Sequence, residues 1–209
     1  IDHGRDLMQK SPVKELLPEM NRVVGESYYK TGVESVAAQY LETYLNATEY
    51  PVNTAVYTMG VIEYNRGDYE RAAERFRSLT DGNNNVTQSS YLYLGQCLMR
   101  KGDNSAAAIA FEKAYKKAYD FKVCETALYN YAVACTAGGH VPFASSIDLL
   151  EDFIDLYPRS KYAAAVDEYL ATVYYKDHDY TRALTSINRI ASPSAKVLAA
   201  KQKVLYALG

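Results

Sequence analysis

The chain has 209 residues, of which 48% are hydrophobic and 23% are charged, and its formal net charge is −2. This balance excludes an intrinsically disordered chain, and the absence of a field of one sign argues against binding to nucleic acid or to an anionic membrane. Length by itself allows one or two globular domains or one elongated array. The composition is unusual in one respect, because 21 residues are Tyr and none is Trp.

Cysteine usage and hydropathy exclude further classes. Cys97, Cys124 and Cys135 form an odd set without CxxC spacing, which predicts buried free thiols rather than a disulfide framework or a zinc site. No stretch approaches the roughly 18 apolar residues of a membrane span, so we expect no direct membrane insertion of this fragment. The sequence starts at Ile1 without a Met and stops inside a repeat signature. We therefore expect it to be part of a longer protein, in which a signal peptide would not be visible.

The first segment of the chain stands apart from the rest. The polar stretch DHGRDLMQKSP leads into the short apolar stretch KELL, and neither shares the pattern that follows. We interpret residues 1–17 as an N-terminal cap or linker.

From residue 18 onward, small residues recur at a fixed distance of 35 residues. Apolar residues at helical spacing surround them, and a Gly-centred turn divides each repeat into two helices. Three columns share this period: Gly25, Gly60 and Gly95, then Gly32, Gly67 and Gly102, then Ala37, Ala72 and Ala107.

Each column has a physical role in a pair of antiparallel helices. Small residues in the first and third columns allow the two backbones to approach closely. Glycine in the second column supplies the left-handed conformation that ends a helix, and Asp68 and Asp103 follow as N-caps of the second helix. Large apolar residues such as Leu41, Phe76 and Phe111 are expected to form the face that the next repeat covers.

The fourth and fifth repeats depart from this pattern. The fourth, TALYNYAVACTAGGHVPFASSIDLLEDFIDLYP, fits with Gly139 at the turn and Ser146 in place of the packing alanine if two residues are inserted near His140. The fifth, DEYLATVYYKDHDYTRALTSINRI, fits although His178 replaces the turn glycine. We expect local distortion or a special contact around residues 140–146.

After Pro193 the segment SAKVLAAKQKVLYALG has the apolar pattern of one more first helix. Its last residues, Leu205, Leu208 and Gly209, have the spacing of Val56, Met59 and Gly60. This pattern predicts the beginning of a sixth repeat.

The order of the columns resembles the tetratricopeptide repeat, most closely in VYTMGVIEYNRGDYERAAERFRSL. The resemblance covers nearly the whole chain and implies an all-α fold, a right-handed α-α superhelix or solenoid of about five helix-turn-helix units plus a truncated sixth. We expect the array to occupy residues 18–209, with units at about 18–52, 53–87, 88–122, 125–160, 164–193 and 194–209.

The resemblance also implies where a partner binds. First helices line the concave surface of such a superhelix, and many of the positions there are tyrosines, which combine rigid apolar area with a hydrogen-bonding tip. The alternative is that individual tyrosines only pack between neighbouring first helices. The predicted partner-binding positions are Arg22, Glu26, Tyr29, Lys30, Tyr57, Tyr64, Asn65, Gln96, Met99, Arg100, Tyr129, Thr136, Glu168, Tyr175 and Lys176.

One known binding mode of the family is not expected. Chaperone-docking arrays clamp a C-terminal carboxylate with Lys, Asn and Arg side chains at set positions. Those positions carry Arg22, Glu26, Thr58, Ser89 and Tyr93 here. A single cation opposed by a carboxylate does not make the clamp, so we expect no binding to the EEVD terminus of heat-shock proteins.

We find no motif for catalysis, metal binding or a cofactor. His3, His140 and His178 lie in the N-terminal segment and in two turns, too far apart to share a site. The sequence lacks GxSxG, P-loop, GxGxxG and HExxH motifs. We therefore expect a non-enzymatic protein with no catalytic residues, no metal and no cofactor.

Three functions remain open. The first is a scaffold that binds a protein or peptide along the tyrosine-rich concave face, as a module of a larger envelope protein. The second is a sensory or regulatory module that feeds a separate effector domain, and the third is a glycan-binding protein. The segment YPRSKYAAAVDEYLATVYYKDHDY is similar to tetratricopeptide proteins of the Gram-negative envelope, which slightly favours the periplasm over the cytoplasm.

Overall fold

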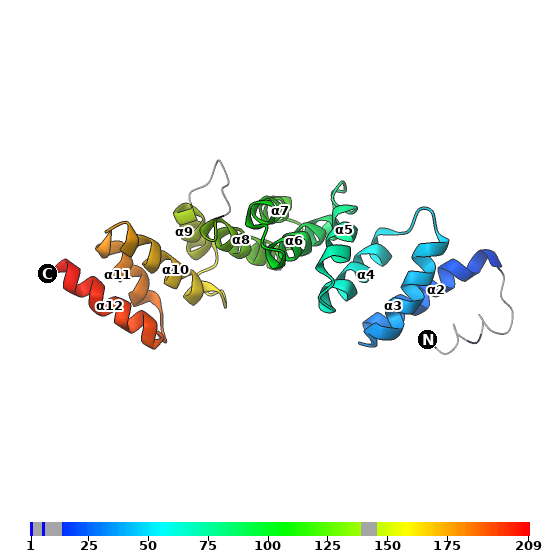
Figure 1. The fold of residues 1–209 in the computed structure, drawn as a ribbon, viewed down its shortest axis with the longest axis horizontal. Helices are drawn as coiled ribbons and strands as arrows, with labels where there is room; N and C mark the ends of the chain where they lie inside the picture. Colours follow the sequence, from blue (N-terminus) through cyan, green and yellow to red (C-terminus); the bar gives the residue numbers. More distant parts are fainter. Residues whose placement is uncertain (2–5, 7–13, 139–145) are drawn as a thin grey trace. The chain divides into compact units, whose positions relative to one another are not determined.

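The computed structural model describes residues 1, 6, 14–138 and 146–209. These residues form eleven α-helices and one short 3-10 helix, and no strand occurs among them (Figure 1). The chain divides into two compact parts, residues 1–103 and 104–209, called here the N-terminal and C-terminal units. Within each unit, helices that follow one another along the chain pack together. The predicted all-α class, a repeat of helix pairs, is confirmed.

The N-terminal unit begins with the 3-10 helix η1 (Lys14–Leu16) and continues through two helix pairs and one further first helix. These helices are α2 (Leu17–Lys30), α3 (Glu34–Ala47), α4 (Asn53–Asn65), α5 (Tyr69–Arg77) and α6 (Asn85–Arg100). In each pair the second helix packs against the first, and α4 also packs against α6 and α2. The first helices α2, α4 and α6 therefore lie next to one another.

The C-terminal unit contains α7 (Asn104–Lys117), α8 (Phe121–Thr136), α9 (Ser146–Leu156), α10 (Ala163–Lys176), α11 (Tyr180–Arg189) and α12 (Ala195–Leu208). Successive helices again pack against each other, from α7 on α8 to α11 on α12. The predicted N-cap Asp68 accepts a hydrogen bond from the backbone N–H of Arg71. In the C-terminal unit Asp179 caps α11 in the same way and accepts from the N–H of Arg182.

The turns inside the pairs share one backbone geometry. Gly32, Gly67 and Gly102 have φ angles of 81°, 84° and 83°, as the second column predicts. Each turn closes with two backbone hydrogen bonds. In the second pair, Gly67 N–H donates to the carbonyl of Tyr64 and Asp68 N–H donates to that of Glu63, both at 3.0 Å. This Schellman motif satisfies carbonyl groups that would otherwise lack partners at the helix end.

The two later turns differ from the expected sequence. In the fourth repeat the residue with the left-handed angle is Gly138, at φ 101°, one residue before the expected Gly139, which lies outside the described residues. In the fifth repeat His178 itself adopts φ 61°. Its N–H donates to Tyr175 and the next N–H, that of Asp179, donates to Tyr174. The Schellman turn therefore persists without glycine.

Small residues of the first column lie against large side chains of the same pair. A Cβ atom added to Gly25 would lie 2.8 Å from Cγ of Leu41, and one added to Gly60 would lie 3.0 Å from Cε1 and Cζ of Phe76. Leu41 and Phe76, which were expected to face the next repeat, thus also pack inside their own repeat. Both are fully buried, and burial of such a side chain contributes about 2 kcal/mol. The core between α3 and α4 comprises Ala37, Ala38, Leu41, Tyr44, Ala55, Met59 and Ile62.

The last helix is in a different register from the expected one. Gly60 lies in the middle of α4, whereas Gly209 follows the last residue of α12. Val197 and Val204 are the buried residues of α12, while Leu205 and Leu208 are exposed. The predicted cap at residues 1–17 and the distortion around residues 140–146 fall mostly outside the described residues. None of the helices in the described ranges is both long and apolar enough to cross a membrane.

Candidate functional site

All predicted partner-binding residues lie on the first helix of a pair. In the N-terminal unit they belong to α2, α4 and α6, and in the C-terminal unit to α8 and α10. We call the surface formed by these helices the first-helix face of each unit.

The first-helix face of the N-terminal unit carries a cluster of aromatic rings. Tyr93 on α6 stacks on the buried Phe76, with ring centroids 5.1 Å apart and an interplanar angle of 17°. Tyr57 and Tyr64 on α4 both meet Tyr93 edge to face, at 5.9 Å and 5.3 Å. Tyr57, Tyr64 and Tyr93 are half-buried. Their rings are therefore fixed by one another while part of each remains open to solvent.

Burial changes the acidity of the Tyr57 and Tyr93 phenols. It raises the pKa of the Tyr57 hydroxyl well above its usual value, and the neighbouring Tyr93 adds to this while a hydrogen bond with Ser89 opposes it. It likewise raises the pKa of Tyr93, with smaller contributions from Tyr29 and Tyr64. The hydroxyls thus remain protonated at neutral pH, so each can donate a hydrogen bond to a partner.

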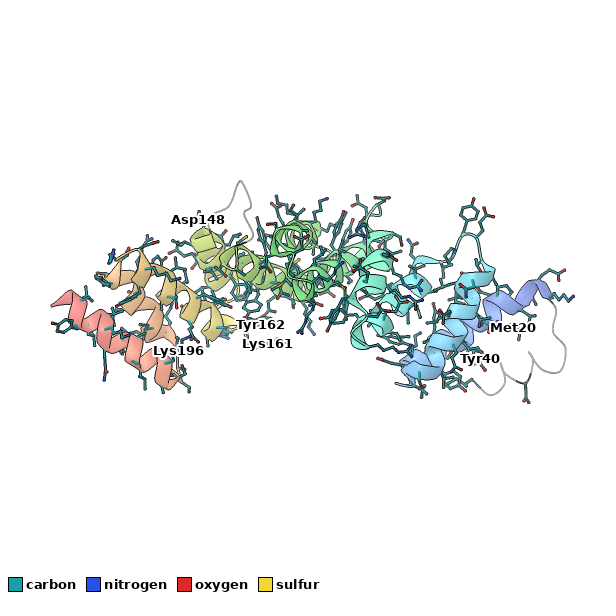
Figure 2. All side chains as sticks on the ribbon, viewed as in Figure 1. Met20, Tyr40, Asp148, Lys161, Tyr162 and Lys196 are labelled. Atoms are coloured by element: carbon teal, nitrogen blue, oxygen red, sulfur yellow. The ribbon has the colours of Figure 1, made fainter. Side chains whose placement is uncertain are left out.

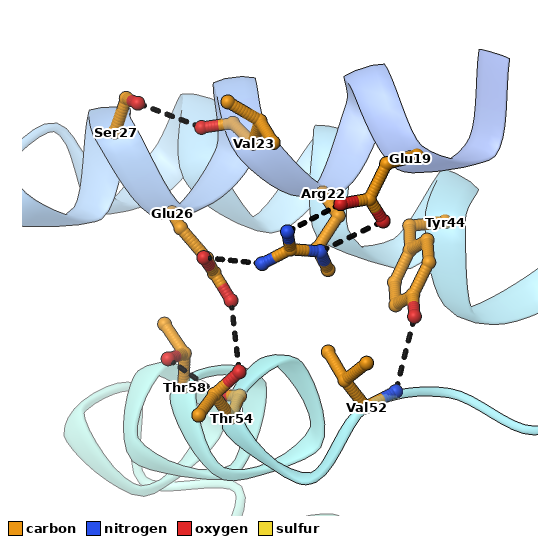
Figure 3. A network of polar contacts seen from close by, with 9 residues as sticks. All are labelled: Glu19, Arg22, Val23, Glu26, Ser27, Tyr44, Val52, Thr54 and Thr58. Carbon is orange, nitrogen blue, oxygen red and sulfur yellow. Dashed lines mark hydrogen bonds and ion pairs between the residues drawn. The ribbon is translucent and has the colours of Figure 1, made fainter. Parts of the chain in front are cut away.

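A polar network ties α2 to α4 at one side of this face (Figure 3). The Arg22 guanidinium donates to both carboxylate oxygens of Glu19, and its Nη1 lies 2.7 Å from Oε2 of Glu26. Oε1 of Glu26 accepts a hydrogen bond from the Thr54 hydroxyl at 3.2 Å. The hydrogen bonds to Glu19 and Glu26 raise the pKa of Arg22. Arg22 and Glu26, both predicted to contact a partner, are consequently engaged with each other.

The other predicted residues of this unit are less constrained. Asn65 donates from Nδ2 to Oε1 of Glu34 on α3 at 2.9 Å, which joins two helix pairs. Tyr29, Gln96 and Met99 are half-buried, and burial raises the pKa of Tyr29, with a further contribution from Glu34. Lys30 and Arg100 are exposed at the C-terminal ends of α2 and α6, where a cation complements the helix dipole.

In the C-terminal unit Tyr129 belongs to a second aromatic group. Its ring stacks on Tyr162 with centroids 4.2 Å apart and an interplanar angle of 10°. Phe153 lies 6.0 Å from Tyr129. The ammonium group of Lys161 lies 4.8 Å from the centroid of Tyr162, within range of a cation–π contact (Figure 2). Burial raises the pKa of Tyr129, helped by Tyr169 and Tyr162.

A small apolar pocket lies further along this unit. It has a volume of about 100 Å³ between α10, α11 and α12, and Glu168 and Tyr175 contribute to its lining. Tyr175 is 39% exposed, and Lys176 beside it is exposed.

The remaining predicted residue, Thr136, lies on α8. The Thr136 hydroxyl donates to the carbonyl of Val133 in its own helix.

Sequence reasoning missed two members of the aromatic groups. Tyr93 is absent from the predicted partner-binding positions, yet its ring contacts those of both Tyr57 and Tyr64. Tyr162 precedes α10 and lies outside the helical columns altogether. Tyr93 could have been found from the 35-residue period, because it lies one period after Thr58 on the preceding first helix.

The cysteines and the acidic side chains form no reactive centre in the part of the chain that is described. Cys97 and Cys124 are buried thiols outside any disulfide, as predicted, whereas Cys135 is half-buried. Burial raises the pKa of Cys97 to about 12 and that of Cys135 to about 11, which makes both thiols poor nucleophiles. No group of three or more His, Cys, Asp or Glu side chains able to hold a metal occurs among the described residues.

Comparison with known proteins identifies the repeat. A sequence profile described as tetratricopeptide repeat matches residues 57–123, a range that includes Tyr57, Tyr64 and Tyr93. This part of the chain therefore consists of tetratricopeptide repeats. Proteins with tetratricopeptide repeats are in general non-enzymatic scaffolds for protein–protein interaction.

Solved structures share the fold of the chain. MamA (residues 41 to the end) from Desulfovibrio magneticus RS-1 is 17% identical, with a TM-score of 0.64 over 89% of this chain and 96% of that chain. A tetratricopeptide repeat protein from Parabacteroides merdae is 16% identical, with a TM-score of 0.63 over 99% of this chain and 78% of that chain. These identities support a common fold and no more. No curated protein matches the sequence.

Proposed function

We propose that this protein is a non-enzymatic scaffold that binds a peptide or protein segment on its tyrosine-rich first-helix face. The observation that carries the proposal is the cluster of Tyr57, Tyr64 and Tyr93 over Phe76. Binding to such pre-ordered rings costs little side-chain entropy, and each phenol brings a hydrogen-bond donor to an apolar surface. Tyr and other aromatic residues dominate the binding energy of many protein interfaces.

The C-terminal unit supports the same proposal independently. Tyr129 is half-buried and held by its stack with Tyr162, and Tyr175 is exposed on α10, the next first helix. Glu168, Tyr175 and Lys176 add charge and hydrogen-bonding capacity to this part of the face. Each unit therefore offers aromatic anchors with polar neighbours, the composition expected of a protein-binding surface.

Photocrosslinking tests this proposal. p-Benzoylphenylalanine replaces Tyr64 in one variant, Tyr129 in a second and the exposed Lys116 on α7 in a control. We expect each of the first two to capture a partner protein, identified by mass spectrometry, and Tyr93→Ala to reduce the yield at position 64. Yields at 64 and 129 no higher than at 116 would contradict a binding role for this face.

The proposal excludes a carboxylate clamp of the chaperone-docking kind. Arg22 is already bound to Glu19 and Glu26, and no second cation occupies the other clamp positions, Thr58, Ser89 and Tyr93. We therefore predict no measurable binding of a fluorescent peptide ending in EEVD, measured by anisotropy. Binding that disappears when the terminal carboxylate is amidated would show this prediction to be wrong.

A place in the cell envelope forms part of the proposal. It rests on a resemblance: the segment that contains Ser160, Lys161 and Tyr162 and precedes α10 is similar to the corresponding segment of tetratricopeptide proteins of the Gram-negative envelope. Fractionation of cells that express the full-length protein tests it, and recovery only with cytoplasmic markers would favour the alternative of a regulatory module feeding an effector domain.

A further inference from the structure

A second recess of the N-terminal unit lies away from the aromatic cluster. It has a volume of about 490 Å³ and is lined by the second helices α3 and α5, by Pro51 in the segment that leads into α4, and by Val56 of α4. We call it the α3–α5 pocket. Its apolar part consists of Leu45, Pro51 and Val56, and its polar part includes Glu42, Arg71, Glu74 and Arg75. Its volume lies within the range of ligand-binding pockets in proteins.

A buried carboxylate lies behind the two arginines. Glu63 on α4 is only 3% exposed. Its Oε2 accepts a hydrogen bond from Nε of Arg75 at 2.7 Å. Its Oε1 makes no hydrogen bond and has only an ion-pair contact with Nε of Arg71 at 3.5 Å. Glu63 therefore forms ion pairs with both Arg71 and Arg75.

The remaining charge of the pocket is negative. Arg71 is shared between Glu63 and Glu42, whose Oε1 lies 3.3 Å from Arg71 Nη2. Glu74 is exposed, and among the described residues its side chain has no hydrogen-bond or ion-pair partner. The lining carboxylates of Glu42 and Glu74, together with the buried Glu63 behind the pocket, thus make three carboxylates for two guanidinium groups. The excess carboxylate is at the surface, where it can reach a ligand, and an incoming anion would meet repulsion from it.

From this charge balance and the apolar floor, we propose that the α3–α5 pocket binds an arginine or lysine side chain of a partner protein. The aliphatic stem of such a side chain covers Leu45, Pro51 and Val56, and its charged head lies at Glu74 and Glu42. A small inorganic cation would leave the apolar floor exposed, and a neutral side chain would leave Glu74 without a counter-charge. This contact is separate from the first-helix face and needs no residue of the aromatic cluster.

The test uses two compounds of almost the same shape. N-acetyl-arginine N-methylamide carries the guanidinium, and N-acetyl-citrulline N-methylamide replaces it with a neutral urea group. Each is titrated into the ¹⁵N-labelled full chain. We expect the arginine compound to shift the amide signals of Leu45, Glu74 and Ser78 and to leave those of Tyr64 and Met99 unchanged. The citrulline compound should bind about three- to tenfold more weakly, the range for a partly exposed charged contact.

Matched variants locate the effect. Glu74→Gln should weaken binding of the arginine compound by a similar factor. Glu70→Gln, one turn earlier on α5, should not, because Glu70 pairs with Lys101 and does not line the pocket. Both residues are exposed, so neither variant should unfold. The proposal is overturned by an absence of shifts with the arginine compound, by equal affinity for citrulline, by an unaffected Glu74→Gln variant, or by stronger binding of N-acetyl-glutamate N-methylamide.

Discussion

His178 occupies a backbone conformation that glycine holds in the other described turns inside helix pairs. Its φ of 61° lies in the left-handed region, as do those of Gly32, Gly67, Gly102 and Gly138. A side chain with a Cβ costs about 1 kcal/mol there. A contact of 2.7 Å between His178 Nδ1 and the Tyr180 hydroxyl offsets part of this strain. The contact is exposed to solvent and is therefore weak.

We predict that His178→Gly stabilises the protein by about 0.5–1 kcal/mol, because relief of backbone strain outweighs the lost contact and the greater freedom of glycine in the unfolded chain. Urea denaturation followed by circular dichroism measures the change. Asp177→Gly is the matched control, since Asp177 has φ −82° at the helix end and gains nothing from glycine. A less stable His178→Gly variant would mean that the contact with Tyr180 dominates.

The pair of Asp167 and Arg189 illustrates a buried charge at the residue scale. Asp167 is 4% exposed, and its Oδ1 accepts a hydrogen bond from Arg189 Nε at 2.8 Å. Burial nevertheless raises the pKa of Asp167 above its usual value, although the charge and hydrogen bond of Arg189 act in the opposite direction. Desolvation thus outweighs pairing, as happens for many buried ion pairs.

We predict that Arg189→Gln destabilises the C-terminal unit by about 2 kcal/mol at pH 7, because Asp167 is left buried without its counter-charge. The pKa of Asp167 in the folded state is above that of the unfolded chain. Its contribution to stability is therefore most favourable below the unfolded pKa and declines as pH rises through the folded pKa. The loss of unfolding free energy in Arg189→Gln should accordingly become smaller on acidification towards pH 4.

Urea denaturation at pH 7 and pH 4 checks the sign of this dependence. Lys196→Gln is the control, because Lys196 pairs with Glu168 at 3.6 Å on the open surface and should change stability little at either pH. A deficit in Arg189→Gln that stays constant or grows on acidification would contradict the assignment of the effect to Asp167.

At the scale of elements, the two helices of a pair are held in close contact. In α2, a Cβ at Gly25 would lie 2.8 Å from Leu41 Cγ and 3.1 Å from the backbone nitrogen of Leu41 in α3. We predict that Gly25→Ala destabilises the N-terminal unit by about 1–2 kcal/mol, since the cost of overpacking exceeds the better helix propensity of alanine. Thermal denaturation measures it.

A second substitution in α2 separates packing from propensity. The Ser27 hydroxyl donates only to the carbonyl of Val23 in the same helix, so Ser27→Ala gains helix propensity without a new contact to α3. It should leave stability unchanged or slightly increased. If Gly25→Ala behaved in the same way, α2 and α3 would not be in the close contact that the first column implies.

The periodic columns were enough to predict the elements, because helix pairs of this kind depend on a few spaced residues. The left-handed glycines, the Asp68 cap and the burial of Phe76 all follow from single positions. Helix starts were harder to predict. Helix α6 begins at Asn85, three residues before the expected unit boundary, because Asn84 caps it through the N–H of Thr87, and a run of asparagines gives no unique cap.

Contacts between side chains far apart in sequence were not predictable from the columns. Asn65 with Glu34 and Arg75 with Glu63 join different helices, and nothing in the spacing of these residues marks them as partners. The same limit applies to the candidate site. The columns predicted Tyr57 and Tyr64, but Tyr93 required knowledge of which side of α6 faces Phe76.

At the scale of the whole molecule, stability in a repeat protein is the sum of what each repeat buries against its neighbours. Helix α4 packs against four other helices and contributes the buried residues Ala55, Val56, Met59, Gly60, Val61, Ile62 and Glu63. Helix α12 packs on α11, and among its residues only Val197 and Val204 are buried. The free energy of local opening should therefore differ strongly between these helices.

We predict that hydrogen–deuterium exchange measured by mass spectrometry is slowest in peptides from α4 and fastest in those from α12. Val204→Ala should accelerate exchange in α12 further, because it removes a fully buried side chain, and should leave α4 unaffected. Leu205→Ala, at the exposed neighbouring position, provides the matched control and should change little. Equal protection of α4 and α12 would mean that the chain opens as one cooperative body rather than repeat by repeat.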